Sequence, residues 1–213
     1  MRQRMIYTVG LFALIAIGAF GLNKTARAGY ESAPYEVVEK DGAIEIREYP
    51  DLVMASTAAN IDARGNDGSF MRLFRYISGD NKGRTKIAMT TPVFMEAESE
   101  GSQGKMGFVM PAKVAVTGAP TPGSSGVQIK VREGGRFAVI RFSGVMNSTK
   151  AKANEKTLRD WMKQRGFTAA GAAERAGYDA PFTPGIFRRN EVLIRLQTPK
   201  PGSEQQETDL AGN

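Results

Sequence analysis

Apolar and polar residues alternate along much of the chain, and two stretches depart from this alternation. Alternation is typical of strands with one buried face, whereas apolar residues at i, i+3, i+4 and i+7 are typical of amphipathic helices. The helical pattern predicts a helix over 69–79, and a capped, charge-paired run predicts a longer helix over 148–166. The alternating runs predict strands over 35–40, 43–50, 52–61, 86–96, 105–111, 127–132, 136–144 and 191–197.

Turn and capping residues support these boundaries. Asp41-Gly42 lies between two alternating runs, which is a strong signal for a β-hairpin. Gly79 and Gly166 follow the two helical runs, and glycine is a common residue just after the end of a helix. Asn147 or Ser148 is a suitable N-cap for the second helix. The two helices are therefore the most sharply delimited elements of the prediction.

The order of elements and part of the sequence repeat in the second half of the chain. EIREYPDLVMAS over 45–56 aligns with KVREGGRFAVIR over 130–141, and residues 90–111 align with residues 179–196. An internal repeat of this kind predicts one antiparallel sheet with two-fold pseudo-symmetry and a helix packed across each half. The expected fold class is α+β, with a concave groove between the halves where ligand pockets are common.

The first 28 residues have the order of a secretory signal peptide. Arg2 and Arg4 precede an apolar run from Met5 to Leu22, and Ala26-Arg27-Ala28 forms an A-x-A cleavage site. The run is longer than the ~7–15 apolar residues of a usual signal segment. It approaches the ~17–25 residues that span a bilayer, so an uncleaved N-terminal anchor is the alternative. Either way, the folded part is expected to be exported to the periplasm or another extracytoplasmic space.

The rest of the chain is expected to form one domain. Its composition is ordinary for a globular protein, with 41% hydrophobic and 24% charged residues. The domain is predicted over 35–197, after a short linker at 29–34. The remaining residues, 198–213, form a polar tail that is expected to be disordered.

Charge and missing residue types exclude several functions. The chain has a net charge of +7, but four basic residues and no acidic residue lie in the first 28, so the remainder carries +3. Nucleic-acid-binding proteins often carry a stripe of Lys and Arg with interleaved aromatic residues, and the sequence has no such stripe. No nucleic-acid partner is therefore expected. The chain contains no Cys and no His. This composition excludes disulfides, Cys-His and Ser-His-Asp catalysis, and ordinary zinc sites.

Two long stretches resemble the signature sequences of the SOUL haem-binding protein family. They are YISGDNKGRTKIAMTTPV over 76–93 and GYDAPFTPGIFRRNEVLI over 177–194, and the resemblance extends over about 35–197. It implies a distorted antiparallel β-barrel with two helices, built from the duplicated unit and related to bacterial effector-binding domains. It also implies haem or a related tetrapyrrole as the ligand. Some members of the family use a histidine to hold the iron, but this chain has none, so only binding in an apolar cleft carries over.

In that binding mode, the first helix forms one wall of the cleft and the loop before the last strand lies opposite. A porphyrin would bury its apolar face against aromatic side chains, and its propionates would pair with Arg75, Arg188 or Arg189. The positions that correspond to the helix wall are Phe70, Met71, Leu73, Phe74, Arg75 and Ile77. Those of the facing loop are Phe182, Phe187, Arg188 and Arg189.

Each of these assignments has a structural alternative. The apolar stripe of the helix could pack on the sheet, which would leave only Met71 and Arg75 for a ligand. Arg188 or Arg189 could form an ion pair with Glu191, and alternate residues that leave a loop point in opposite directions. Methionine is a possible iron ligand, but it is also a common core residue. The methionines near the expected groove are Met71, Met89, Met95, Met106 and Met110.

The leading functional hypothesis is an exported, monomeric tetrapyrrole-binding protein that acts as a carrier or buffer. It would contact a membrane only through an uncleaved N-terminal segment. A binding module for another lipophilic molecule is the first alternative, and a hydrolase is the second. A hydrolase would need two carboxylates that converge in the groove, and the strand carboxylates considered are Glu45, Glu48, Glu96 and Glu191. No spacing among these four defines a catalytic pair, so no catalytic residue and no metal site are predicted.

Overall fold

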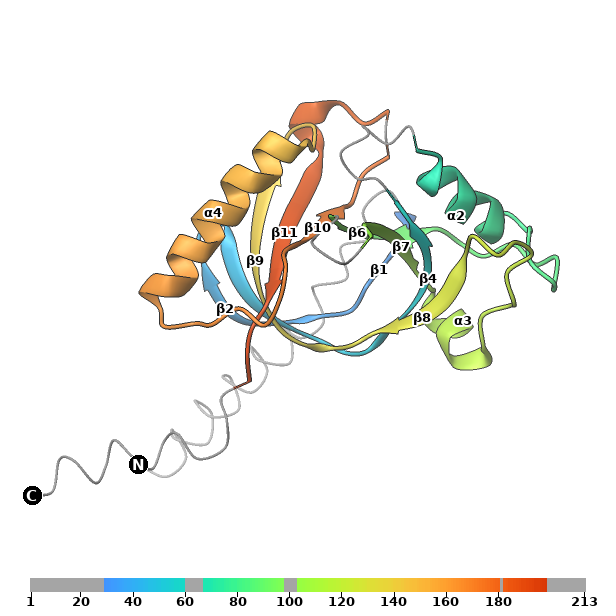
Figure 1. Ribbon diagram of the computed structural model, residues 1–213, viewed down its shortest axis with the longest axis horizontal. Helices are drawn as coiled ribbons and strands as arrows, with labels where there is room; N and C mark the ends of the chain where they lie inside the picture. Colours follow the sequence, from blue (N-terminus) through green and yellow to red (C-terminus); the bar gives the residue numbers. More distant parts are fainter. Residues whose placement is uncertain (1–28, 60–66, 98–102, 181, 199–213) are drawn as a thin grey trace, which may run out of the picture.

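A curled antiparallel sheet of nine strands forms the centre of the protein (Figure 1). The structure is a computed structural model that describes residues 29–59, 67–97, 103–180 and 182–198. Its strands are β1 (Glu31–Ser32), β2 (Glu36–Asp41), β3 (Ile44–Tyr49), β4 (Leu52–Ala58), β5 (Thr90–Thr91), β6 (Val93–Glu96), β7 (Lys105–Val109), β8 (Gln128–Arg132), β9 (Gly135–Ser143), β10 (Glu174–Gly177) and β11 (Arg189–Arg195). Its helices are α2 (Ser69–Ile77), α3 (Ala112–Thr117), α4 (Ser148–Gln164) and the 3-10 helix η2 (Gly185–Phe187).

The strand order shows the internal repeat directly. The sheet runs β2-β3-β9-β11-β10-β6-β7-β4-β8, so that β10, β11 and β9 on one side repeat β6, β7 and β4 on the other. The two repeats exchange a strand, because β8 pairs with β4 of the first half and β3 pairs with β9 of the second. The predicted duplication and the α+β class are therefore confirmed, and the exchange joins the halves into one sheet.

The two longer helices lie on the outer side of the curled sheet, one on each half (Figure 1). Leu73 and Tyr76 of α2 are buried in a cluster with residues of β4 and β7, and Leu158 and Met162 of α4 are buried in a cluster with residues of β9 and β11. A third cluster, which includes Tyr49, Phe94, Phe137 and Leu193, occupies the concave side and draws on both halves. The helices thus cover the outer face and leave the concave face to the sheet itself.

The predicted helices and the first hairpin are confirmed. Helix α4 begins after Asn147, whose side chain accepts a hydrogen bond from the Lys150 backbone N–H at 2.8 Å. Strands β2 and β3 pair around the turn that follows Asp41, with Asp41 opposite Ile44. Gly42 has a φ of +57°, a conformation that glycine adopts without the strain of a side chain.

Several short elements were not predicted from the sequence. The strand expected over 86–96 was wrong in its first part, because residues 86–89 lie outside the strands and Pro92 separates β5 from β6. Strand β5 pairs in parallel with β1, which lies within the expected linker at 29–34. Helix α3 and strand β10 were missed, and β11 begins at Arg189, two residues before the predicted start.

The expected signal peptide, 1–28, and nearly all of the expected tail, 198–213, lie outside the described residues. Within the part of the chain that the structure describes, no helix combines the length and apolar character needed to cross a membrane.

Candidate functional site

Helix α2 presents two large apolar side chains to solvent. Met71 is 50% exposed and Phe74 is 43% exposed, and Arg75 beside them is also exposed. The half-buried Phe70 supports Phe74, because the two rings stack with centroids 6.1 Å apart. The other side of Phe70 meets Phe108 of β7 edge-on at 5.2 Å. The outer face of α2 is therefore an apolar surface anchored to the sheet beneath it.

The inner face of α2 is used for packing. Leu73 and Ile77 are buried in the cluster between α2 and the sheet, together with Tyr76. The structure does not place Leu73 or Ile77 on the surface, so both support the helix and neither can meet a ligand on its outer face. Of the six helix positions inferred from the family resemblance, Met71, Phe74 and Arg75 are exposed and Phe70 is partly so.

The loop before β11 is the most exposed apolar segment near the end of the fold. Phe182 is 88% exposed, and Phe187 in η2 is exposed as well. Ile186 between them is a third exposed apolar residue, which the sequence analysis missed because nothing in the pattern predicted the 3-10 turn. Arg188 is half-buried, and its Nε donates to the Thr183 backbone oxygen at 2.7 Å.

These side chains are the candidates for ligand contact, and they come from two segments of the chain, α2 and the loop before β11. In Figure 1, the start of α2 and η2 both lie toward the top of the molecule, and the loop between β10 and η2 lies on the side of η2 that is toward α2. Exposed apolar residues are ordinary when they are scattered, but a concentration of them indicates an interaction site. We call this set the apolar rim, and its members are Met71, Phe74, Phe182, Ile186 and Phe187.

Arg189 does not belong to the rim, because its side chain points into the concave interior. Its Nη2 donates to Glu191 Oε1 at 2.6 Å, and its guanidinium lies 4.0 Å from the centre of the Tyr178 ring. Arg47 of β3 binds the same carboxylate through two bonds, with Nη1 to Oε2 at 2.8 Å and Nη2 to Oε1 at 3.0 Å. Tyr178 Oη completes the set at 2.8 Å from Oε2. Arg189 is thus part of a buried charge cluster and is not available to a ligand on the rim.

Burial and charge act in opposite directions on Glu191, which has no exposed surface. Burial raises the pKa of Glu191, but attraction to Arg47 and Arg189 and the hydrogen bonds from both outweigh it and hold the pKa below 4.5. Burial also raises the pKa of Tyr49 to about 12 and that of Tyr178 well above 10. The cluster therefore contains an ionised carboxylate between two cations at neutral pH.

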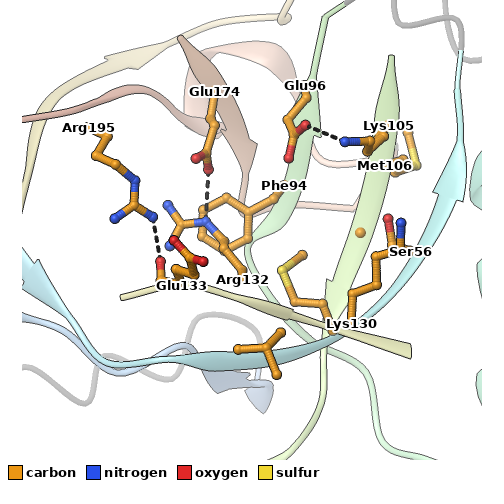
Figure 2. Close-up of a pocket in the computed structure, with 13 residues that line it drawn as sticks. Ser56, Phe94, Glu96, Lys105, Met106, Lys130, Arg132, Glu133, Glu174 and Arg195 are labelled. Carbon is orange, nitrogen blue, oxygen red and sulfur yellow. Dashed lines mark hydrogen bonds and ion pairs between the residues drawn. The ribbon is translucent and has the colours of Figure 1, made fainter. Parts of the chain in front are cut away.

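The concave face also contains a cavity of about 300 Å³, lined by strands of both halves (Figure 2). Arg132 Nε donates to Glu174 Oε2 at 2.9 Å, and Lys105 Nζ lies 3.4 Å from Glu96 Oε2. The cavity is on the opposite side of the sheet from α2, because Met54 of β4 lines it while the neighbouring Ala55 packs in the α2 cluster. The rim and the cavity are therefore separate features.

Comparison with known proteins identifies the family. The family model for SOUL heme-binding proteins matches residues 30–195. The chain belongs to the SOUL family. It is 28% identical over 163 residues to Heme-binding protein 1 of Xenopus laevis, and the matched region covers 72% of this chain and 84% of that protein. Heme-binding protein 1 of Xenopus tropicalis matches with the same identity and coverage.

Solved structures support the fold of this SOUL protein. The C-terminal domain of EcmrR has a TM-score of 0.53 at 11% identity and covers 77% of this chain and 98% of its own. A hydrolase from Listeria innocua has a TM-score of 0.51 at 10% identity and covers 75% of this chain and 94% of its own. At these identities the likeness extends to the fold alone.

The remaining candidates of the sequence analysis have structural partners in the SOUL fold. Glu45 pairs with Arg47, Glu48 with Arg136, Glu96 with Lys105, and Glu191 with Arg47 and Arg189.

Among the five methionines, Met71 is exposed, Met89 and Met95 are half-buried, and Met106 and Met110 are buried. The sequence analysis missed Arg132 and Glu174 of the cavity, although the internal repeat aligns Arg132 with Arg47.

Replacing Glu191 tests the buried charge cluster. The change Glu191→Gln removes the negative charge between two buried arginines, so the free energy of unfolding at pH 7 should fall by about 3 kcal/mol or more. The change Glu96→Gln is the matched control, and it should cost no more than about 1 kcal/mol because its ion pair with Lys105 is exposed. Urea unfolding measures both values.

The same variant has a distinct pH dependence. Since folding lowers the pKa of Glu191, its stabilisation is present above the unfolded value of about 4.3 and is lost as the pH falls through the folded value. Wild-type protein should therefore lose more stability than Glu191→Gln between pH 7 and about pH 3. An equal loss in both proteins would contradict the assigned charge state.

Proposed function

We propose that this SOUL protein is an exported carrier or buffer that binds haem or a related tetrapyrrole non-covalently on the apolar rim. Membership of the SOUL heme-binding family supports the ligand class. The observation that carries the proposed site is the exposure of five large apolar side chains on two segments, α2 and the loop before β11. The apolar start of the chain, residues 1–28, supports export.

The chemistry of the rim suits a porphyrin. A planar macrocycle covers much apolar surface at once, and each Å² removed from water contributes about 25 cal/mol. Phe74 is suited to face such a ring, since it is already held in place by Phe70. Arg75 lies next to Phe74 on the exposed side of α2, and Arg188 follows Phe187 directly. These two arginines are the proposed partners of the propionates.

The iron is not expected to contribute much to affinity. The chain has no histidine, and Met71 is the exposed member of the methionines considered as ligands. A lone thioether on a surface helix is a weak basis for axial ligation, so the proposed binding depends on the macrocycle and its propionates.

A second candidate function uses the same surface. A rim without a histidine would also accept another lipophilic molecule, such as an acyl chain or an aromatic metabolite. Native mass spectrometry of the protein isolated from its own compartment distinguishes the two. A bound porphyrin mass supports the tetrapyrrole, whereas an acyl or aromatic mass supports the second candidate.

The first test is the change Phe74→Ala. It removes the best-supported ring of the rim without opening the core, so hemin affinity should fall about tenfold or more, in line with the ~1.5–3 kcal/mol for burial of a large apolar side chain. Titration followed in the Soret band measures the dissociation constant. Val116→Ala on α3 is the control, because Val116 is also exposed but lies outside the rim. Equal affinities in Phe74→Ala and Val116→Ala would rule out the rim as the site.

The second test compares hemin with iron-free protoporphyrin IX. Because the rim supplies contacts to the macrocycle, the two dissociation constants should agree within about threefold, and Met71→Leu should leave the spectrum of bound hemin unchanged. Fluorescence quenching measures protoporphyrin binding. If affinity depends strongly on the iron, or if Met71→Leu shifts the Soret band, the iron-independent mode is wrong.

A further inference from the structure

The two halves of the sheet carry an arginine at equivalent positions. The internal repeat aligns Arg47 with Arg132. The sheet preserves this correspondence, because Arg47 of β3 lies opposite Phe137 and Arg132 of β8 lies opposite Leu52, and the repeat aligns these two partners as well. Both guanidinium groups lie among residues of the concave face, so the comparison of their surroundings is direct.

Glu191 binds both Nη atoms of Arg47, and it has no counterpart beside Arg132. Glu191 of β11 lies opposite Arg141 of β9. The internal repeat aligns Arg141 with Ser56 of β4, and Ser56 lies opposite Gly107 of β7. Gly107 is therefore the equivalent of Glu191. At this position one half therefore has a carboxylate for the Nη atoms of its arginine, and the other half has a glycine.

Arg132 shows the consequence of this difference. Its side chain is 9% exposed, and Glu174 binds only its Nε. Nη1 and Nη2 are buried and have no hydrogen-bond partner among the described residues. The guanidinium lies 4.5 Å from the centre of the Phe94 ring and 4.3 Å from that of Phe137, and neither ring offers a strong acceptor. Unsatisfied donors on a buried cation are costly, so an acceptor is missing at this point.

The space for that acceptor lies in the concave cavity. Gly107 lines it together with Lys105 and Arg132, and Figure 2 shows the latter two side chains. A Cβ atom on Gly107 would meet the end of the Met54 side chain, and its next neighbour would be the Ala55 backbone oxygen at 3.6 Å. A methionine side chain is flexible and adapts to what is beside it. Met54 therefore fills the position of the missing carboxylate with a group that can move.

The charges of the cavity favour an anion. Lys105 corresponds in the sheet to Arg189, the second cation that binds Glu191. Lys105 lies opposite Ala58 and Arg189 lies opposite Ser143, and these two partners each follow the aligned pair Ser56 and Arg141 by two residues. The lining contains four cations against three acids, a net charge of +1, and two of these acids, Glu96 and Glu174, pair with Lys105 and Arg132. The cations of the cavity are Lys105, Lys130, Arg132 and Arg195, and its acids are Glu96, Glu133 and Glu174.

We propose that the concave cavity binds the carboxylate of an organic acid, which takes the place that Glu191 holds in the other half of the sheet. The carboxylate lies between Arg132 and Lys105 and displaces the end of Met54, while the apolar part of the acid rests on Phe94. A volume of about 300 Å³ is at the lower end for small-molecule pockets, so the occupant is a small acid or the carboxylate arm of a larger ligand. This site lies across the sheet from the rim and does not rest on the proposed function.

Calorimetric titration of the whole protein with benzoate is the first test, with benzamide as the neutral analogue of the same shape. Benzoate should bind, and benzamide should bind at least tenfold more weakly. Arg132→Gln should reduce benzoate affinity at least tenfold. Arg136→Gln is the matched control, because this arginine of β9 is exposed and pairs with Glu48 outside the cavity. It should leave benzoate affinity unchanged within twofold.

A second titration identifies the source of the carboxylate. If hemin also binds at least tenfold more weakly to Arg132→Gln, and its dimethyl ester binds equally to both proteins, the site receives a propionate and the porphyrin lies on the concave side of the sheet instead of on the rim. If hemin affinity is unchanged while benzoate affinity falls, the site receives a separate acid. Both outcomes support the proposal. It is overturned if neither benzoate nor hemin binds less tightly to Arg132→Gln than to wild-type protein.

The change at Gly107 tests the same site without a ligand and without loss of Arg132. Gly107→Glu restores the arrangement of the other half, whereas Gly107→Gln has the same size and no charge. Gly107→Glu should melt several degrees above Gly107→Gln at pH 7, and this difference should vanish when Arg132→Gln is added. Gly107→Glu should also abolish benzoate binding. Equal melting temperatures for the two variants, together with retained benzoate binding, would contradict the proposal.

Discussion

The sheet depends on one buried carboxylate that holds strands from both halves of the chain together. Glu191 of β11 binds Arg47 of β3, which is 144 residues away in the sequence, and Arg189 of its own strand. Each of these charges alone would be costly to bury, but together they compensate one another. Because β3 has crossed from the first repeat into the second, the cluster also stabilises the strand exchange that makes one sheet from two repeats.

This constraint determines which surfaces remain for ligands. The helices cover the outer face of the sheet, and their inner positions are taken by packing, as Leu73 and Leu158 illustrate. What is left outside is the rim, formed by Phe74 and its neighbours on α2 and by the loop before β11. What is left inside is the half of the concave face where Gly107 replaces the carboxylate. The repeat thus gives one half a fully hydrogen-bonded charge cluster and the other half a cavity beside an arginine whose Nη atoms have no hydrogen-bond partner among the described residues.

Much of the fold was predictable because its signals are local or repeated. The 3.6-residue period predicted α2, the cap at Asn147 predicted the start of α4, and the aligned halves predicted the duplicated sheet. Strand β10 and helix α3 are too short to produce a period. The Gly134-Gly135 pair between β8 and β9 suggests a hairpin, but β8 pairs with β4, and β9 pairs with β3 and β11. The inward direction of Arg189 depends on β11 starting two residues early, and the cluster around Glu191 depends on long-range pairing. Neither can be read from neighbouring residues.

The most direct test of the rim is the response of individual methionine methyl groups to a bound porphyrin, measured by carbon-13 NMR on methyl-labelled protein. The macrocycle shifts nearby protons through its ring current, and iron-free protoporphyrin IX avoids paramagnetic effects. Met71 lies on the rim, and Met110 is buried in the cluster beneath α2. We predict a large shift at Met71 and little change at Met110. An unchanged Met71 signal at saturating porphyrin would contradict the assignment of the rim as the tetrapyrrole site.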